Sequence, residues 1–169
     1  MNERMKDATR SVQRAYSVIE MKSMKEDGDL VLIEGIATTP APDRMGDVVE
    51  PDGAKFKLPI PLLWQHDARQ PIGMVEEATV TKDGISIRGW IKRGVTASID
   101  EAIKLIKGGL VRGLSIGFRG LDVEEIKGSW SLRFKEWEWL ELSAVTIPAN
   151  AEASIQSVKK FDTEQKAAS

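Results

Sequence analysis

The chain has 169 residues, a formal net charge of −2 and no cysteine, so it has the length of one domain and cannot form disulfides, thiolate metal sites or a cysteine nucleophile. Acidic and basic residues are mixed along the whole chain, which leaves no basic stripe for nucleic acid. The apolar runs are shorter than the roughly 20 residues of a membrane-spanning helix, and segment 1–10 lacks the apolar core of a secretory signal, so we expect a cytoplasmic protein without a membrane anchor.

The first part of the chain predicts an arm followed by strands. Residues 1–15 are polar and predict either a frayed arm or a short helix. From Tyr16 the pattern alternates with period two, and after the turn at residues 26–29 the run LVLIEGIAT follows. This arrangement predicts an opening β-hairpin.

Residues 38–53 predict a long ordered loop, because prolines and glycines interrupt every regular pattern there. The loop carries four carboxylates of the type that calcium or magnesium prefers: Asp43, Asp47, Glu50 and Asp52. Their spacing matches no defined cation loop, so we interpret them as solvated turn residues and predict no metal site.

The middle of the chain predicts a strand, a hairpin and a helix. IPLLWQHD reads as a short apolar strand that ends in His66, the only histidine, and MVEEATVTKDGISIRGWI reads as a hairpin with a turn at Asp83-Gly84. In ASIDEAIKLIKGG, Ser98 and Glu101 form a capping box, apolar residues recur at helical spacing, and the glycine pair 108–109 ends the helix.

The last part predicts two antiparallel strands, FRGLDVEE and SWSLRFKEWEWLELSAVTI, joined at Lys127-Gly128, and then a terminal helix capped by Asn150. About seven strands in hairpin order, with two or three helices and no alternation of parallel strands and helices, predict a mainly β (α+β) fold. We expect a closed or nearly closed antiparallel barrel with peripheral helices.

Residues 113–117 spell G-x-S-x-G, the pattern of the nucleophile elbow in lipases and esterases. That elbow needs a strand before the serine and a helix after it, whereas here the predicted helix precedes Ser115. The histidine also lies 49 residues upstream instead of downstream. Ser115 is therefore no α/β-hydrolase nucleophile, and its glycines could simply ease the curvature of a strand.

Serine catalysis needs only a hydroxyl, a base and an acceptor that orients the base, in any chain order. Histidine is the side chain that titrates near neutrality, which makes His66 the candidate base. The glycines around Ser115 leave backbone N–H groups open to a bound carbonyl, and we assign the oxyanion donors to Ile116 and Gly117.

Strand parity points to Glu141 as the orienting acceptor. With period two, Trp137, Trp139, Glu141 and Ser143 share one face, and a carboxylate beside tryptophans is costly unless it is paired. That face could equally be exposed to solvent, which would make Glu141 an ordinary solvated carboxylate. Asp67 is the rival, although strand neighbours point to opposite faces, so it reaches His66 only from a bend.

Four blocks, IEGIATTPAPDRMGDVVEPDGAKF, LLWQHDARQPIGMV, LIKGGLVRGLSIGF and LELSAVTIPANAEA, resemble the successive blocks of the phage prohead (capsid maturation) protease family, which is similar in fold to the herpesvirus assemblin serine proteases. The resemblance covers about residues 30–158. It matches His66 to the family's catalytic histidine and Ser115 to its nucleophile, and Glu141 falls in the block of the third, acidic member. We expect a protease domain at 16–161 and a tail at 162–169.

The resemblance implies a cofactor-free serine endopeptidase that cleaves scaffolding and capsid proteins, and itself, inside the procapsid in the host cytoplasm. It also implies a homo-oligomer, with the major capsid protein and its scaffolding segment as substrates. Two alternatives remain open: a catalytically inactive capsid-assembly module, which would need neither His66 nor Ser115, and a small-molecule serine esterase.

Overall fold

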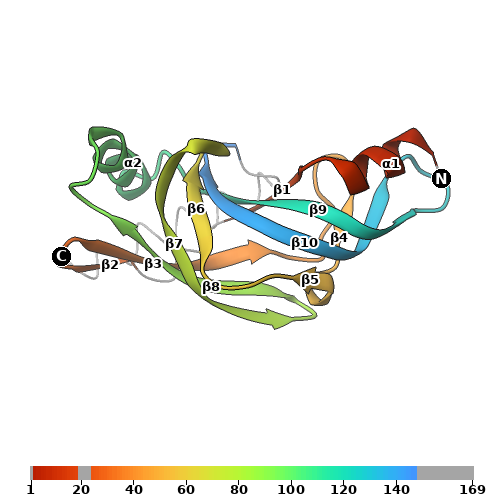
Figure 1. Ribbon diagram of the computed structural model, residues 1–169, viewed down its shortest axis with the longest axis horizontal. Coiled ribbons are helices and arrows are strands. Elements are labelled where there is room, and N and C mark those ends of the chain that lie inside the picture. The colour runs from red at the N-terminus through yellow and green to blue at the C-terminus, as the bar shows by residue number, and fades with distance from the viewer. Residues whose placement is uncertain (1, 19–23, 148–169) are drawn as a thin grey trace.

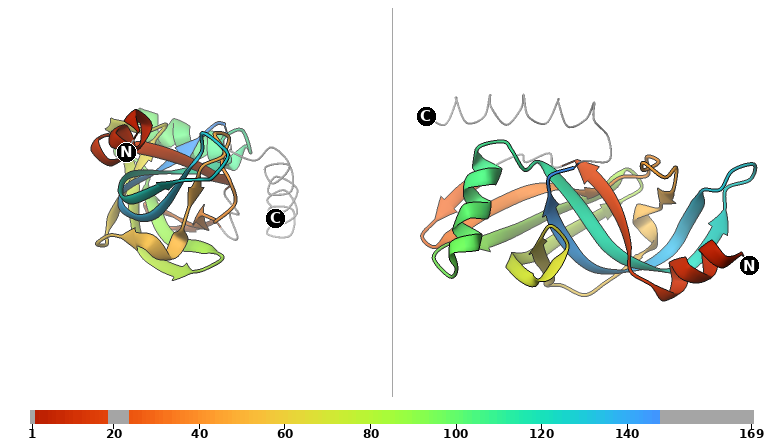
Figure 2. Two further views of the ribbon diagram at one scale, coloured as in Figure 1. Left: turned by 90° about the vertical axis from the view of Figure 1, so that its right-hand side faces the viewer. Right: turned by 90° about the horizontal axis from the view of Figure 1, so that it is seen from above.

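The computed structural model describes residues 2–18 and 24–147, which form one large β-sheet with a helix near each end of the molecule (Figures 1 and 2). The helical elements are α1 (Glu3–Arg10), the 3-10 helix η1 (Pro51–Gly53) and α2 (Ala97–Lys107). The strands are β1 (Gln13–Val18), β2 (Met24–Asp27), β3 (Leu30–Thr38), β4 (Val48–Val49), β5 (Ala54–Lys55), β6 (Ile60–Trp64), β7 (Asp67–Thr81), β8 (Gly84–Lys92), β9 (Gly113–Glu125) and β10 (Leu132–Val145).

The strands follow the order β1-β9-β10-β6-β7-β8-β3-β2, and β4 and β5 add to β10. Most neighbours are antiparallel, but β10 pairs in parallel with β4, β5 and β6. The mainly β fold with few helices is confirmed. The count of about seven strands was too low, since the sheet has ten, and within the described residues no pairing joins β1 to β2 to close a barrel.

Turn chemistry explains the hairpins. Asp27 pairs with Leu30 across a two-residue loop in which Gly28 has a φ of +58°. Thr81 pairs with Gly84, so the second loop lies one residue earlier than predicted. Strand β2 pairs with β3, as the predicted hairpin requires, whereas β1 pairs with β9.

The two-residue strands β4 and β5, with η1 between them, interrupt the segment predicted as a loop. They lie along β10, where Val48 pairs with Arg133 and Ala54 pairs with Trp137. The prolines prevent a long strand, yet short stretches between them still add to an exposed sheet edge.

Helix α2 buries one apolar stripe, made of Ile99, Ala102, Ile103 and Ile106. Its cap differs from the prediction. Thr96 has an extended backbone and its hydroxyl accepts the N–H of Ile99, so Thr96 takes the capping position that was assigned to Ser98. Gly109, with a φ of +74°, provides the predicted left-handed stop.

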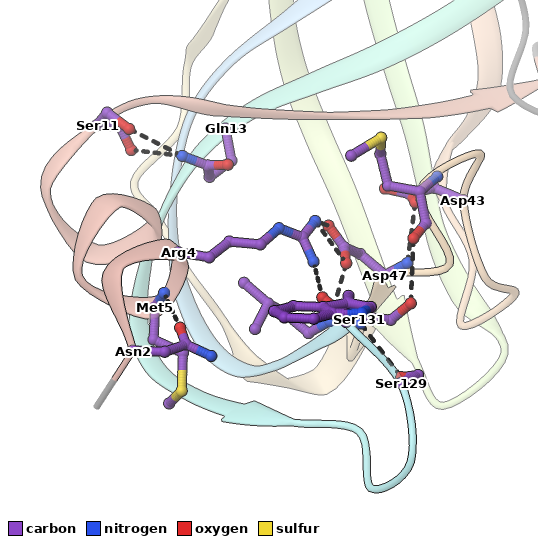
Figure 3. A network of polar contacts seen from close by, with 12 residues as sticks. Asn2, Arg4, Met5, Ser11, Gln13, Asp43, Asp47, Ser129 and Ser131 are labelled. Carbon is purple, nitrogen blue, oxygen red and sulfur yellow. Dashed lines mark hydrogen bonds and ion pairs between the residues drawn. The ribbon is translucent and has the colours of Figure 1, made fainter.

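The N-terminal segment forms α1, the second of the two predicted alternatives, and the buried side chain of Ala8 lies in its interface with the sheet. Figure 3 shows Arg4 of α1 beside Asp47 of the acidic loop, with Nη2 of Arg4 2.7 Å from Oδ2 of Asp47. Asp43 accepts the N–H groups of Met45 and Asp47, while burial raises its pKa. These two carboxylates thus bind protein groups in the described residues.

Edge-to-face aromatic pairs fill the core beneath β9 and β10. The ring of Phe118 lies 4.9 Å from that of Phe134 and 5.4 Å from that of Trp137, measured between centroids. Within the described residues, no helix is long and apolar enough to cross a membrane. The predicted terminal helix capped by Asn150 and the predicted tail at 162–169 lie outside the described residues, and the proposed division into arm, domain and tail stays a prediction.

Candidate active site

The sheet order places the three candidate residues on neighbouring elements. Ser115 lies in β9, Glu141 lies in β10, and His66 lies in the two-residue turn between β6 and β7. Because β10 pairs with β9 on one edge and with β6 on the other, the residues meet although they are 49 and 75 positions apart.

The three side chains form one hydrogen-bonded row. Nε2 of His66 lies 2.6 Å from Oγ of Ser115, and Nδ1 of His66 lies 2.5 Å from Oε1 of Glu141. An ionised carboxylate only accepts, so Nδ1 carries the ring proton and Nε2 of the neutral ring is the acceptor for the Ser115 hydroxyl. This is the arrangement in which a histidine takes a proton from a serine.

The row is buried. Ser115 has no exposed surface, and the side chains of His66 and Glu141 are 4% and 14% exposed. Electrostatic interactions and hydrogen bonds are stronger in such a site than in water.

The turn that carries His66 has an unusual backbone. Trp64 pairs with Asp67, and the two residues between them have φ of +51° (Gln65) and +60° (His66), which is the pattern of a type I′ turn. Glycine or asparagine normally takes these positions, and other residues there cost about 1–3 kcal/mol each. The turn is held to the end of β10, since the N–H of Gln65 donates to the carbonyl of Ala144 at 3.0 Å.

The side chain of Gln65 adds a second attachment to the same strand end. Its Nε2 donates to Oγ1 of Thr146 at 2.7 Å, and its Oε1 accepts the N–H of Thr146 at 3.3 Å. The strained turn therefore persists because its neighbours fix it, as is common at functional sites.

A model of the caudovirus prohead serine protease family matches residues 44–167, a segment that contains the whole row. The chain belongs to this family.

Two relatives and one solved structure are similar to this chain. The chain is 58% identical over 160 residues to the capsid polyprotein of Pseudomonas phage PAJU2, covering 92% of this chain and 24% of that one. It is 34% identical over 142 residues to the prohead protease of Escherichia phage T5, covering 79% of this chain and 65% of that one. The chain thus spans about a quarter of the length of the first relative and about two thirds of the length of the second. The capsid assembly protease of bacteriophage T4 has a similar fold, with a TM-score of 0.56 at 14% identity over 81% of this chain and 99% of that one.

Asp67, the rival of Glu141 for the role of orienting His66, has other partners. Its carboxylate accepts from the N–H of Arg69 at 2.9 Å, from Nε of Arg69 at 3.1 Å and from Nε2 of Gln70 at 3.1 Å. The hydrogen bond from the Arg69 side chain is the main cause that lowers the pKa of Asp67 to about 2. Asp67 therefore stays ionised and bound to its own turn.

Glu141 contacts His66 as predicted, but the parity argument that led to it was wrong. The register shifts between Trp139, which pairs with Phe118, and Glu141, which pairs with Gly117. Opposed residues share a face and consecutive residues do not, so this bulge turns Glu141 to the face opposite Trp139. Glu141 lies with Ser115 on the site face, while Trp139 packs in the core.

The two residues predicted as oxyanion donors lie inside a paired strand. At Ile116 and Gly117, β9 pairs with β1 on one side and with β10 on the other. Each backbone N–H in such a strand faces a neighbouring strand, so the sheet pairing argues against this prediction.

Gly117 has a different reason to be glycine. A Cβ atom at this position would lie 2.2 Å from Oε1 and 2.7 Å from Cδ of Glu141. No side chain fits there while Glu141 binds His66. The last glycine of the G-x-S-x-G string thus leaves room for the carboxylate.

Sequence reasoning assigned no role to Ser143, although parity placed it on the same face as Glu141. Its side chain is fully buried, and its Oγ lies 2.7 Å from Oε2 of Glu141. The only sequence signal was the spacing of two residues along one strand, which many strand serines share.

Proposed function

We propose that this chain is the serine endopeptidase of a phage head, with Ser115 as nucleophile, His66 as general base and Glu141 as the residue that orients the base. The observation that carries the proposal is the row of short contacts from Ser115 through His66 to Glu141. Membership of the prohead serine protease family supports the same chemistry.

The geometry supports acyl transfer in two steps. Nε2 of His66 takes the proton of Ser115 while Oγ attacks the carbonyl carbon of a peptide, and the imidazolium then gives that proton to the leaving amine. Water, deprotonated by the same nitrogen, hydrolyses the acyl-enzyme and restores the serine. Glu141 holds the proton on Nδ1 and stabilises the positive charge that the ring carries during each step.

Relatives support a substrate in the phage head. One is named a capsid polyprotein and another a prohead protease. We infer that the chain cleaves the major capsid protein at its scaffolding segment, and cleaves itself, inside the procapsid in the host cytoplasm. We further propose that the chain acts as a homo-oligomer.

Co-expression with the capsid protein of the same phage tests the proposal. Ser115→Ala removes the attacking oxygen, so capsid processing and self-cleavage should stop while the melting temperature stays near that of the wild type. Ser98→Ala is the matched control, because Ser98 is exposed on α2 and should leave processing unchanged. Mass spectrometry of the products then gives the cleavage sites.

Processing at the wild-type rate by Ser115→Ala would refute the serine-protease mechanism. A fluorophosphonate that labels neither protein would instead indicate a catalytically inactive assembly module. Rapid cleavage of simple esters with no cleavage of unfolded capsid protein would indicate a small-molecule esterase.

A further inference from the structure

A second serine, Ser143, lies next to the catalytic row and touches two of its members. In β10 it pairs with Ser115 of β9 and, on the other side, with Leu63 of β6. Its hydroxyl accepts the backbone N–H of His66 at 3.2 Å and donates to Oε2 of Glu141 at 2.7 Å. Ser143 is fully buried, so both bonds form away from water.

The chemistry of the partners fixes the direction of both bonds. A backbone N–H only donates and an ionised carboxylate only accepts, whereas a hydroxyl has one donor and two acceptor sites. The hydroxyl of Ser143 can therefore accept from His66 and donate to Glu141 at the same time. The reverse directions are excluded, because neither partner can take the other role. An alanine at this position would offer neither bond.

Each of the two bonds restrains one member of the His66–Glu141 pair, whose side chains must be aligned with each other. Glu141 uses Oε1 for the His66 ring and Oε2 for Ser143, so both oxygens are held and the carboxylate cannot rotate freely. The other bond holds the backbone of His66, which has a φ of +60° in a turn that costs energy to form.

We propose that Ser143 is a positioning residue, which locks the Glu141 carboxylate and the His66 backbone in the relative orientation that proton transfer from Ser115 needs. This role rests on the proposed function of the row. Ser143 does not touch the reacting atoms in the structure and acts through the two residues that it binds.

The test compares Ser143→Ala with Ser143→Thr in the full chain, using the rate of fluorophosphonate labelling of Ser115 at neutral pH. Loss of alignment should slow labelling by the alanine variant about tenfold to a hundredfold. The threonine variant keeps the hydroxyl and should label within about threefold of the wild type, since it retains both partners. Thermal melting shows whether each variant is folded.

A second readout follows the hydrogen bonds without requiring activity. The NMR signal of the proton on Nδ1 of His66, and the exchange rate of the His66 amide, report the bonds to Glu141 and to Ser143. In Ser143→Ala, the ring proton should exchange faster with water and the amide should lose protection. In Ser143→Thr, both should resemble the wild type.

These results separate the two proposals. If Ser115→Ala labels as fast as the wild type, the proposed function fails, and the NMR comparison still tests Ser143. If Ser143→Ala labels at the wild-type rate with an unchanged ring proton, the positioning role is overturned while the proposed function stands. Should the alanine variant not fold, Ser143→Cys, whose thiol is a weak donor and acceptor, takes its place in the same comparison.

Discussion

Two polar clusters in this molecule bring together residues that are distant in the sequence, and only one of them can transfer a proton. At the α1 end, Oδ1 of Asp47 accepts from Arg4 and from the N–H of Leu132 across 43 and 85 positions (Figure 3). At the other cluster, His66 joins Ser115 and Glu141 across 49 and 75 positions. In both clusters a partly or largely buried carboxylate accepts hydrogen bonds from distant residues. Distance in the sequence and hydrogen bonding therefore do not distinguish a catalytic site from a structural contact.

The difference lies in the nitrogen-bearing side chain at the centre of each cluster. An arginine stays protonated at every pH at which proteins fold, so Arg4 holds Asp47 without exchanging a proton. A histidine takes up and releases a proton near neutrality, so His66 can serve Ser115 as a base. This comparison predicts that changes at the first cluster alter stability and that changes at the second alter rate.

The largest effect should come from protonation of His66. As the pH falls and the imidazole becomes charged, kcat/KM should fall about tenfold per pH unit, because an imidazolium cannot accept the Ser115 proton. An NMR titration of the single histidine should follow this acidic limb. An acidic limb that persists unchanged in the residual activity of His66→Ala would show that another group is the base.

Asp67 cannot produce that limb. Its pKa of about 2 lies below the ordinary value, so its pairing with Arg69 favours the folded state above about pH 4 and is lost as the pH falls toward 2. The Asp67 carboxylate therefore stays ionised at every pH above about 4.

Next in size is the loss of the orienting carboxylate. Glu141→Gln keeps the shape but removes the charge that stabilises the imidazolium, so kcat should fall more than about tenfold with little change in melting temperature. Asp67→Asn is the matched control and should leave kcat unchanged, because Asp67 binds Arg69. If the two variants exchanged these outcomes, the third role would belong to Asp67.

A smaller loss of rate should follow from a methyl group at position 117. In Gly117→Ala, the new Cβ meets the Glu141 carboxylate and pushes it away from His66, so kcat should fall about tenfold. Gly120→Ala, in the same strand, meets Val123 and the carbonyl of Ala8 and should lower stability instead. Equal effects of the two variants on rate and on melting would contradict the role of Gly117.

The smallest effect on rate should come from the structural cluster. Asp47→Asn weakens the bonds to Arg4 and should lower the free energy of unfolding by about 1–3 kcal/mol, while kcat per folded molecule stays unchanged. Asp43→Asn should cost less, since an amide oxygen still accepts the two N–H groups that Asp43 binds. Denaturant unfolding measures both, and a loss of kcat in Asp47→Asn would show that the two clusters are coupled.

Local patterns predicted the local elements well. The hairpins β2–β3 and β7–β8 and the helix α2 follow from turn residues and from apolar spacing, which act over a few residues. The parallel pairing of β10 with β6 could not be predicted in this way, because it depends on which distant strand edges meet once the sheet assembles.

The candidate site shows the same limit at the level of single residues. Glu141 was predicted from strand parity and from the family resemblance, but the parity argument fails at Leu140, which lies between the two ladder positions where the register shifts. A bulge inserts one residue and reverses every later position, and no residue pattern in the strand marks it. Ser143 depends on the same register, which is why its contacts emerge only from the structure.

The position of β10 in the sheet also sets when the site can exist. Before residues 132–145 have been synthesised, β9 and β6 have no common neighbour, because β10 lies between them. A nascent chain that already contains Ser115 and His66 therefore has nothing to hold them at 2.6 Å. The proposed catalytic row therefore cannot form until the chain has been synthesised as far as β10.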